Sequence, residues 1–163
     1  SGIEALLLLG RTAAHMQALL DHLRALAAAM NHPPSIMGAL LPAKQQGQQF
    51  MLYNESLSGG DETMWFLSSA DVLVNATSVG LKADDADTTR LLIDVNALPA
   101  TTLVMDMIFN PPQTALLRAA HARGCATLNG LSMLLYQGAL AFELWTGRAA
   151  PIEAMRKALG IFL

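Results

Sequence analysis

The chain has 163 residues, the length of about one domain, and this is enough to bury a hydrophobic core. Hydrophobic residues make up 53% of the chain and charged residues only 14%, which excludes an intrinsically disordered protein. The net charge is -3 and the sequence has no cluster of basic residues, so the composition argues against a nucleic-acid partner.

The first elements along the chain are predicted to be a strand and a long helix. Residues 5–9 form a short apolar run that ends at Gly10, which is typical of a buried strand. Hydrophobic residues then recur at spacings of three and four over residues 12–30, which predicts an amphipathic helix ended by the prolines that follow. Residues 36–41 and 50–53 could both be strands, with a polar surface loop at 44–49 between them.

The rest of the chain continues the alternation of strands and helices. Short, β-branched or turn-bounded runs predict strands at residues 71–75, 102–108 and 126–128. Proline near the start and glycine after the end favour helices at 111–123 and 151–159, glycine after the end favours one at 131–146, and a capping turn favours one at 62–69. This order predicts an α/β fold with a mostly parallel sheet and helices on both faces.

Some classes of site are excluded by the same reading. The longest apolar stretches fall far short of the roughly 18–20 residues that a membrane span needs. The four histidines lack zinc-ligand spacing, and the acidic run at residues 84–87 is read as a solvated loop, so no metal is expected. The single cysteine, Cys125, excludes an internal disulfide and is typical of a reducing compartment such as the cytoplasm.

Ligands of open parallel sheets bind beyond the carboxyl ends of the strands. Polar residues and glycines stand at four such ends, in segments 10–12, 75–78, 106–109 and 129–130. Three of them begin longer motifs: NATSVG from Asn75, DMIFNP from Asp106, and NGLSML from Asn129, the last followed by QGA from Gln137 and WTG from Trp145.

These motifs, in this order, resemble the carboxyl-terminal half of the shikimate/quinate dehydrogenase family. The segment Gly10-Arg11-Thr12 stands where that family usually has Asn-Arg-Thr or Asn-Arg-Ser. The resemblance covers nearly the whole chain and is weakest over residues 30–69. It implies a Rossmann-like, doubly wound, mostly parallel sheet. It also implies hydride transfer between a nicotinamide and a hydroxylated cyclohexene or cyclohexane carboxylate, as in the 3-dehydroshikimate/shikimate pair.

Two parts of the family pattern do not occur in this sequence. One is the amino-terminal substrate domain with its catalytic Lys and Asp, and the other is the glycine-rich turn after the first strand. Residues 1–163 are therefore expected to be a partial dinucleotide-binding domain with the carboxyl-terminal helices, inactive alone and without a catalytic residue.

A missing first strand has a structural consequence. In the sheet order 3-2-1-4-5-6, strands 5–9 and 71–75 would lack the strand between them. That strand could be present but unseen or cleaved, which we favour; the two strands could pair directly; or a second chain could supply the pairing.

The cofactor side of the predicted site begins with Arg11 and Thr12. Dinucleotide-binding folds bind the adenosine ribose at the tip of the strand predicted at residues 5–9. An arginine there can pair with a 2′-phosphate, so we expect NADP as the cofactor, with NAD possible. The alternative is a surface arginine near a helix start. The resemblance assigns the other cofactor contacts to Asn75, Ala76, Thr77, Ser78, Met107, Gly130 and Met133. The alternatives are a plain turn for residues 75–78 and core filling for Met133.

The resemblance places Phe109 and Gln137 on the substrate side. Gln137 matches the family's substrate-binding glutamine, although it could instead face water. Phe109 replaces the usual tyrosine and lacks its hydroxyl, which leaves room for a related cyclohexene acid as substrate. Phe142, Leu144 and Trp145 are read as core residues.

Two functions stay open. The first is the NADP-binding part of a shikimate- or quinate-type dehydrogenase, with a small-molecule substrate, no nucleic-acid or membrane partner, and a possible homodimer. The second is a non-catalytic nucleotide-binding or interaction module. The coding sequence just upstream would discriminate between them.

Overall fold

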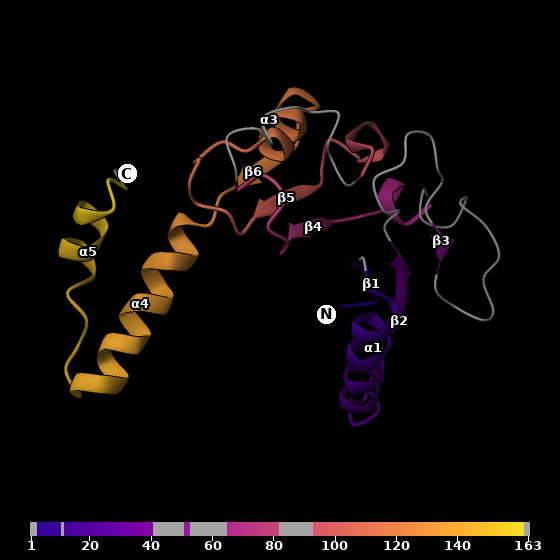
Figure 1. The fold of residues 1–163 in the computed structure, drawn as a ribbon, viewed down its shortest axis with the longest axis horizontal. Helices are drawn as coiled ribbons and strands as arrows, with labels where there is room; N and C mark the ends of the chain where they lie inside the picture. The colour runs from indigo at the N-terminus through magenta and orange to yellow at the C-terminus, as the bar shows by residue number, and fades with distance from the viewer. Residues whose placement is uncertain (1–2, 11, 41–50, 53–64, 82–92, 162–163) are drawn as a thin grey trace. The chain divides into compact units, whose positions relative to one another are not determined.

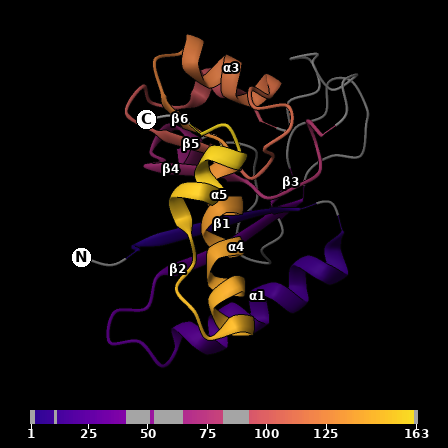
Figure 2. The same ribbon diagram turned by 90° about the vertical axis from the view of Figure 1, so that its left-hand side faces the viewer.

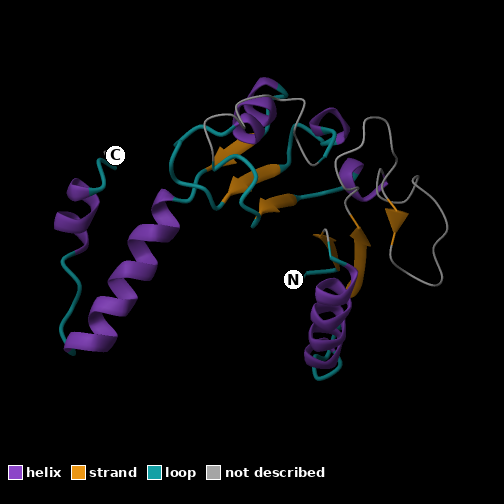
Figure 3. Cartoon of the chain, viewed as in Figure 1, coloured by secondary structure: helices purple, strands orange, loops and turns teal. Residues whose placement is uncertain are grey.

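The computed structural model describes residues 3–10, 12–40, 51–52, 65–81 and 93–161, and it divides the chain into two compact units (Figure 1). The first unit is Ser1–Ser69 and the second is Ala70–Leu163. Each unit has its own three-stranded sheet, with order β1-β2-β3 in the first and β4-β5-β6 in the second (Figure 3).

The sheet of the first unit is built around β2. Strand β1 (Ala5–Gly10) pairs in parallel with β2 (Ser35–Leu40), and β3 (Met51–Leu52) pairs antiparallel with β2. Helix α1 (Ala13–Ala27) buries Met16 and Leu20 against this sheet. Gly38 allows the close packing, since a Cβ atom there would lie 2.8 Å from Leu20 Cδ1.

The second unit has a parallel sheet, and helix α3 (Ala115–Ala122) packs on it. Its strands are β4 (Val72–Asn75), β5 (Leu103–Asp106) and β6 (Ala126–Leu128). Helix α3 packs against β5 and β6 and shares a core with the wholly buried Val104. A 3-10 turn at Val95–Ala97 precedes the buried Leu98.

Two helices follow the sheet and pack against each other. Helix α4 (Leu131–Thr146) and helix α5 (Ile152–Ala158) run side by side in both views (Figures 1 and 2). Leu135 and Ala139 form the buried face of α4. Leu144 and Trp145 are each 82% exposed, so the expectation that they are core residues is wrong. Apolar residues lie on most sides of α4, but within the described residues only Leu135 and Ala139 of this helix are buried.

The strand neighbours within each of the two sheets are those of a doubly wound fold. Strands β1 and β2 take the places of strands 2 and 3, and β4, β5 and β6 take those of strands 4 to 6. Within the described residues β1 pairs with β2 and β4 pairs with β5, each at the end of its own sheet.

Three predicted boundaries shift for local reasons. Helix α1 ends at Ala27 rather than at residue 30, because the amides of Ala29 and Met30 donate to carbonyls three residues back, as in a 3-10 turn, and not four residues back. Strand β5 ends at Asp106, where the Ile108 amide turns to the Asp106 side chain. Helix α3 begins after its Thr114 cap and leaves the preceding prolines outside. No helix in the described ranges is long and apolar enough to cross a bilayer.

Candidate functional site

The carboxyl ends of the three strands of the second unit meet at one edge of the sheet. Asn75 lies opposite Asp106, and the Met107 amide donates to the Asn75 carbonyl at 3.0 Å. One step along the sheet, the Gly130 amide donates to the Ile108 carbonyl at 3.1 Å. Three of the four predicted segments, 75–78, 106–109 and 129–130, are thereby brought together.

The centre of this edge is the carboxylate of Asp106, which is wholly buried. Its Oδ1 accepts hydrogen bonds from Asn75 Nδ2 and from the Ile108 amide, both at 3.1 Å. Its Oδ2 accepts from Thr114 Oγ1 at 2.6 Å. Three donors from three segments satisfy the carboxylate, as a buried charge requires.

The loop after β4 is held closed by its own side chains. Asn75 Oδ1 accepts from the Thr77 amide at 3.0 Å and from Thr77 Oγ1 at 2.7 Å, and Asn75 Nδ2 also donates to the Val79 carbonyl at 3.1 Å. The Val79 amide in turn donates to Thr77 Oγ1 at 3.1 Å. The side chains of Asn75 and Thr77 are thus occupied inside the loop, whereas Ala76 and Ser78 are exposed.

This arrangement changes how the four predicted loop residues can act. The exposed members can offer a ligand the main chain at residue 76 and the hydroxyl of Ser78. Asn75 and Thr77 fix the shape of the loop, because all four hydrogen-bonding positions of the Asn75 amide are used. A plain turn would not consume an amide so completely.

Gly130 is fixed by close contact with the strand beside it. It is buried, and a Cβ atom added to it would overlap the carbonyl oxygen of Met107. Met107 itself is partly exposed at the same edge. Glycine is therefore required here for close approach of the backbone.

The two substrate-side residues, Phe109 and Gln137, and the cofactor-side residue Met133 belong to the second unit. Phe109 is 45% exposed in the segment after β5. Met133 is half-buried in the first turn of α4, and Gln137 is exposed one turn later. The exposed position of Gln137 agrees with the alternative that it faces water in this chain, and it also leaves the amide accessible to a ligand.

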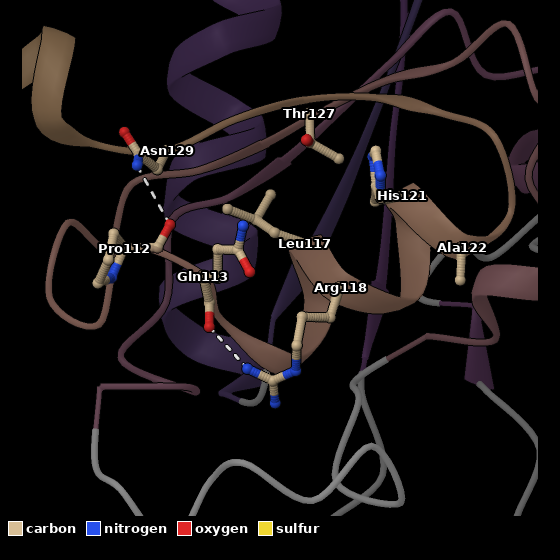
Figure 4. A pocket seen from close by; sticks show the side chains of 8 residues that line it. All are labelled: Pro112, Gln113, Leu117, Arg118, His121, Ala122, Thr127 and Asn129. Carbon is tan, nitrogen blue, oxygen red and sulfur yellow. Dashed lines mark hydrogen bonds between the residues drawn. The ribbon is translucent and has the colours of Figure 1, made fainter. Parts of the chain in front are cut away.

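Asn129 joins the start of α4 to the segment before α3. Its Oδ1 accepts from the Leu131 amide at 3.1 Å, and its Nδ2 donates to the Pro112 carbonyl at 3.1 Å. A hollow of about 350 Å³ lies next to Pro112 and Asn129, between α3 and β6 (Figure 4). Figure 4 shows that Arg118 is held there by the Gln113 carbonyl, at 2.7 Å. None of the predicted site residues lines this hollow.

The remaining two predicted residues belong to the first unit. Thr12 occupies the N-cap position of α1 with extended backbone, and it is exposed and makes no capping hydrogen bond through its side chain. Arg11 lies outside the described residues. In the part of the chain that the structure describes, no three His, Cys, Asp or Glu side chains gather into a metal-binding group.

Sequence reasoning assigned no functional role to the two residues that organise the site, Asp106 and Thr114. Asp106 is wholly buried and accepts hydrogen bonds from three segments. Thr114 is the N-cap of α3, and its Oγ1 accepts from the Leu117 amide at 3.3 Å. A threonine three residues after a proline and directly before an apolar run is the sequence signal that could have found it.

Sequence comparisons point to one group of proteins. The family model described as the Shikimate 5'-dehydrogenase C-terminal domain matches residues 130–159. A shikimate dehydrogenase (NADP(+)) from Methanopyrus kandleri is 44% identical over 100 residues, which make up 61% of this chain and 34% of the relative.

Structure comparisons agree with them. The shikimate 5-dehydrogenase of Listeria monocytogenes, solved with shikimate and NAD, has a TM-score of 0.73 over 97% of this chain and 48% of that one, and at 24% identity this likeness shows the fold. The quinate dehydrogenase of Corynebacterium glutamicum, solved with NAD, has a TM-score of 0.71 and 25% identity over 99% of this chain and 48% of that one. The chain thus spans about a third of the curated relative and about half of each solved one.

Proposed function

We infer that this chain, which belongs to the shikimate dehydrogenase family as its motifs predicted, is the NADP-binding part of a dehydrogenase. The proposed reaction is reversible hydride transfer between the nicotinamide and an alcohol carbon of a hydroxylated cyclohexene or cyclohexane carboxylate. The curated relative is named for NADP and shikimate, and the solved relatives contain NAD with or without shikimate. NAD is the second choice of cofactor.

The observation that carries this proposal is the closed loop after β4. Its internal hydrogen bonds turn the side chains of Asn75 and Thr77 inward, and they leave Ala76 and Ser78 exposed at the carboxyl edge of a parallel sheet. That edge is where doubly wound sheets bind their ligands. Gly130 and Met107 continue the same edge through a backbone contact that a side chain would block.

The residues of this chain would bind and orient the cofactor, which supplies the hydride when bound. Ala76 and Ser78 would line it from one side, and Met107, Gly130 and Met133 would lie near its nicotinamide end. Phe109 and Gln137 would face the substrate. The neutral amide of Gln137 can hold a hydroxyl or a carboxylate by hydrogen bonds. Proton transfer is left to groups outside residues 1–163, so no residue of this chain is given a catalytic role.

Cofactor preference tests the proposal. The polypeptide encoded by the complete reading frame that contains this chain should use NADPH with a higher kcat/KM than NADH, because Arg11 can pair with the 2′-phosphate. Arg11→Ala should remove most of that preference and leave the use of NADH nearly unchanged. Reduction of 3-dehydroshikimate and of 3-dehydroquinate, followed by NADPH absorbance, would identify the substrate.

Two results would contradict parts of the proposal. Equal efficiency with both cofactors in the unsubstituted protein would remove the role of Arg11. Binding of NADPH without turnover of either acid would favour the second candidate, a non-catalytic nucleotide-binding module.

A further inference from the structure

Asp106 is a buried charge that no predicted role explains. It is wholly buried, and its three hydrogen-bond donors are all neutral: the Asn75 amide, the Ile108 main chain and the Thr114 hydroxyl. Burying a carboxylate costs free energy unless hydrogen bonds replace its water. A neutral asparagine has one accepting oxygen and could not accept from donors on both sides, so the two carboxylate oxygens have a role of their own.

The carboxylate gives direction to the hydrogen bonds around it. An ionised carboxylate only accepts, so Asn75 must present its NH2 group to Asp106 and Thr114 must present its hydroxyl proton. The amide oxygen of Asn75 is then aimed into the loop, where it receives the Thr77 amide and hydroxyl. The lone pairs of Thr114 Oγ1 are left for the Leu117 amide at the start of α3.

We propose that Asp106 is a positioning residue for the cofactor, because its acceptor-only carboxylate fixes the orientation of Asn75 and with it the exposed segment 76–78. This inference rests on the proposed function and deepens it. Among the described residues, the hydrogen-bond partners of the buried Asp106 carboxylate are these three donors, so we expect it to act through Asn75 and not by contact with a ligand. The hydrogen bond between Asn75 and Asp106 joins residues that are 31 positions apart in the sequence.

Asp106→Asn is the direct test, since it keeps the shape and removes the acceptor-only character. If the NH2 group of the substituted amide faces Asn75, two donors face each other. If it faces Thr114, the Thr114 hydroxyl must turn away from its present donating position. We expect NADPH to bind about tenfold more weakly, as for the loss of one buried hydrogen bond. We expect the amides of residues 76–80 to exchange with solvent about tenfold faster, while those of β5 keep their protection.

The control is Asp94→Asn in the same unit. Asp94 is exposed and also accepts from a neighbouring main-chain amide, that of Asn96, at 2.9 Å. It should change neither the NADPH dissociation constant nor the exchange of residues 76–80. A second pair keeps the test decisive if Asp106→Asn fails to fold: Thr114→Ser should behave as the unsubstituted protein, and Thr114→Val should reproduce the weaker binding.

The outcomes separate the two proposals. A folded Asp106→Asn protein with unchanged NADPH affinity and unchanged exchange at 76–80 overturns the positioning role. Failure of the unsubstituted protein to bind NADPH overturns the proposed function, and a change in loop exchange would then show only that Asp106 shapes the loop. Weaker binding in the Thr114→Ser protein, which keeps both hydroxyl hydrogen bonds, would mean that the packing of Thr114, and not its bond to Asp106, controls the site.

Discussion

Two regions of the second unit differ in which residues they bury: polar residues are buried at the ends of β4 and β5, whereas apolar residues are exposed on the surface of α4. At the strand ends, Asp106 and Thr114 are buried among hydrogen-bond partners from three segments. On α4, Tyr136, Leu140 and Leu144 lie on one exposed face at a spacing of four. Hydropathy alone would have predicted the reverse.

The difference shows what decides burial in this chain. A polar group can be buried when each of its hydrogen-bonding positions finds a partner, and Asp106 has three donors. An apolar side chain is buried only when another element covers it, and α5 with the rest of the second unit covers one face of α4. At the candidate site, the buried carboxylate of Asp106 is therefore satisfied by hydrogen bonds, whereas on α4 the apolar face of Tyr136, Leu140 and Leu144 is exposed.

The largest expected effect tests how tightly the strand ends are built. In Gly130→Ala the added methyl group would overlap the Met107 carbonyl oxygen, and backbone cannot move aside cheaply. We expect a loss of about 3 kcal/mol or more in the free energy of unfolding, measured by urea denaturation.

Gly138→Ala on α4 is the matched control. There the nearest atom to the added methyl group would be the mobile end of Met155, at 3.4 Å, in ordinary contact. Since alanine favours a helix by about 1 kcal/mol over glycine, stability should be unchanged or slightly raised. Equal losses in the two variants would contradict the contrast between the two regions.

Sequence reasoning reached the fold through strong local signals. The alternation of apolar runs with glycine and proline located most helices and strands, because those residues act on the backbone within a few positions. The shared edge of the three strand ends followed from the parallel topology. The length of β5 did not follow, because its end depends on a hydrogen bond between the Ile108 amide and the Asp106 side chain.

The next effect compares two leucines of one helix. Leu135 is 1% exposed and Leu144 is 82% exposed, so Leu135→Ala should cost about 2 kcal/mol of stability and Leu144→Ala less than about 0.5 kcal/mol. Thermal or urea unfolding of both variants measures the difference. Similar losses would mean that Leu144 is covered by something in solution, and sedimentation would then reveal a larger species.

The smallest effect on stability is expected at the substrate side. Gln137 is exposed, so Gln137→Ala should change the free energy of unfolding by less than about 0.5 kcal/mol. In the complete protein it should nevertheless raise the KM for the acid substrate and leave the KM for NADPH nearly unchanged. If the substitution changed neither constant, Gln137 would be a surface residue and nothing more.

The site was less predictable than the fold for a physical reason. Asn75 was recognised by its place after a strand, but its role depends on partners such as Asp106, which is 31 residues away. A turn-forming asparagine and one locked into a network look alike in sequence. Trp145 was misread for a related reason, since hydropathy cannot tell whether another element will cover it.

Cys125 has a practical consequence. It is the one cysteine of the chain, it is 3% exposed, and its thiol donates to the Pro99 carbonyl at 3.3 Å just before β6. A thiol-specific dye can therefore react only when the chain opens around β6. The labelling rate of the unaltered protein would report the free energy of that opening, and comparing it with and without NADPH would show whether ligand binding reaches β6.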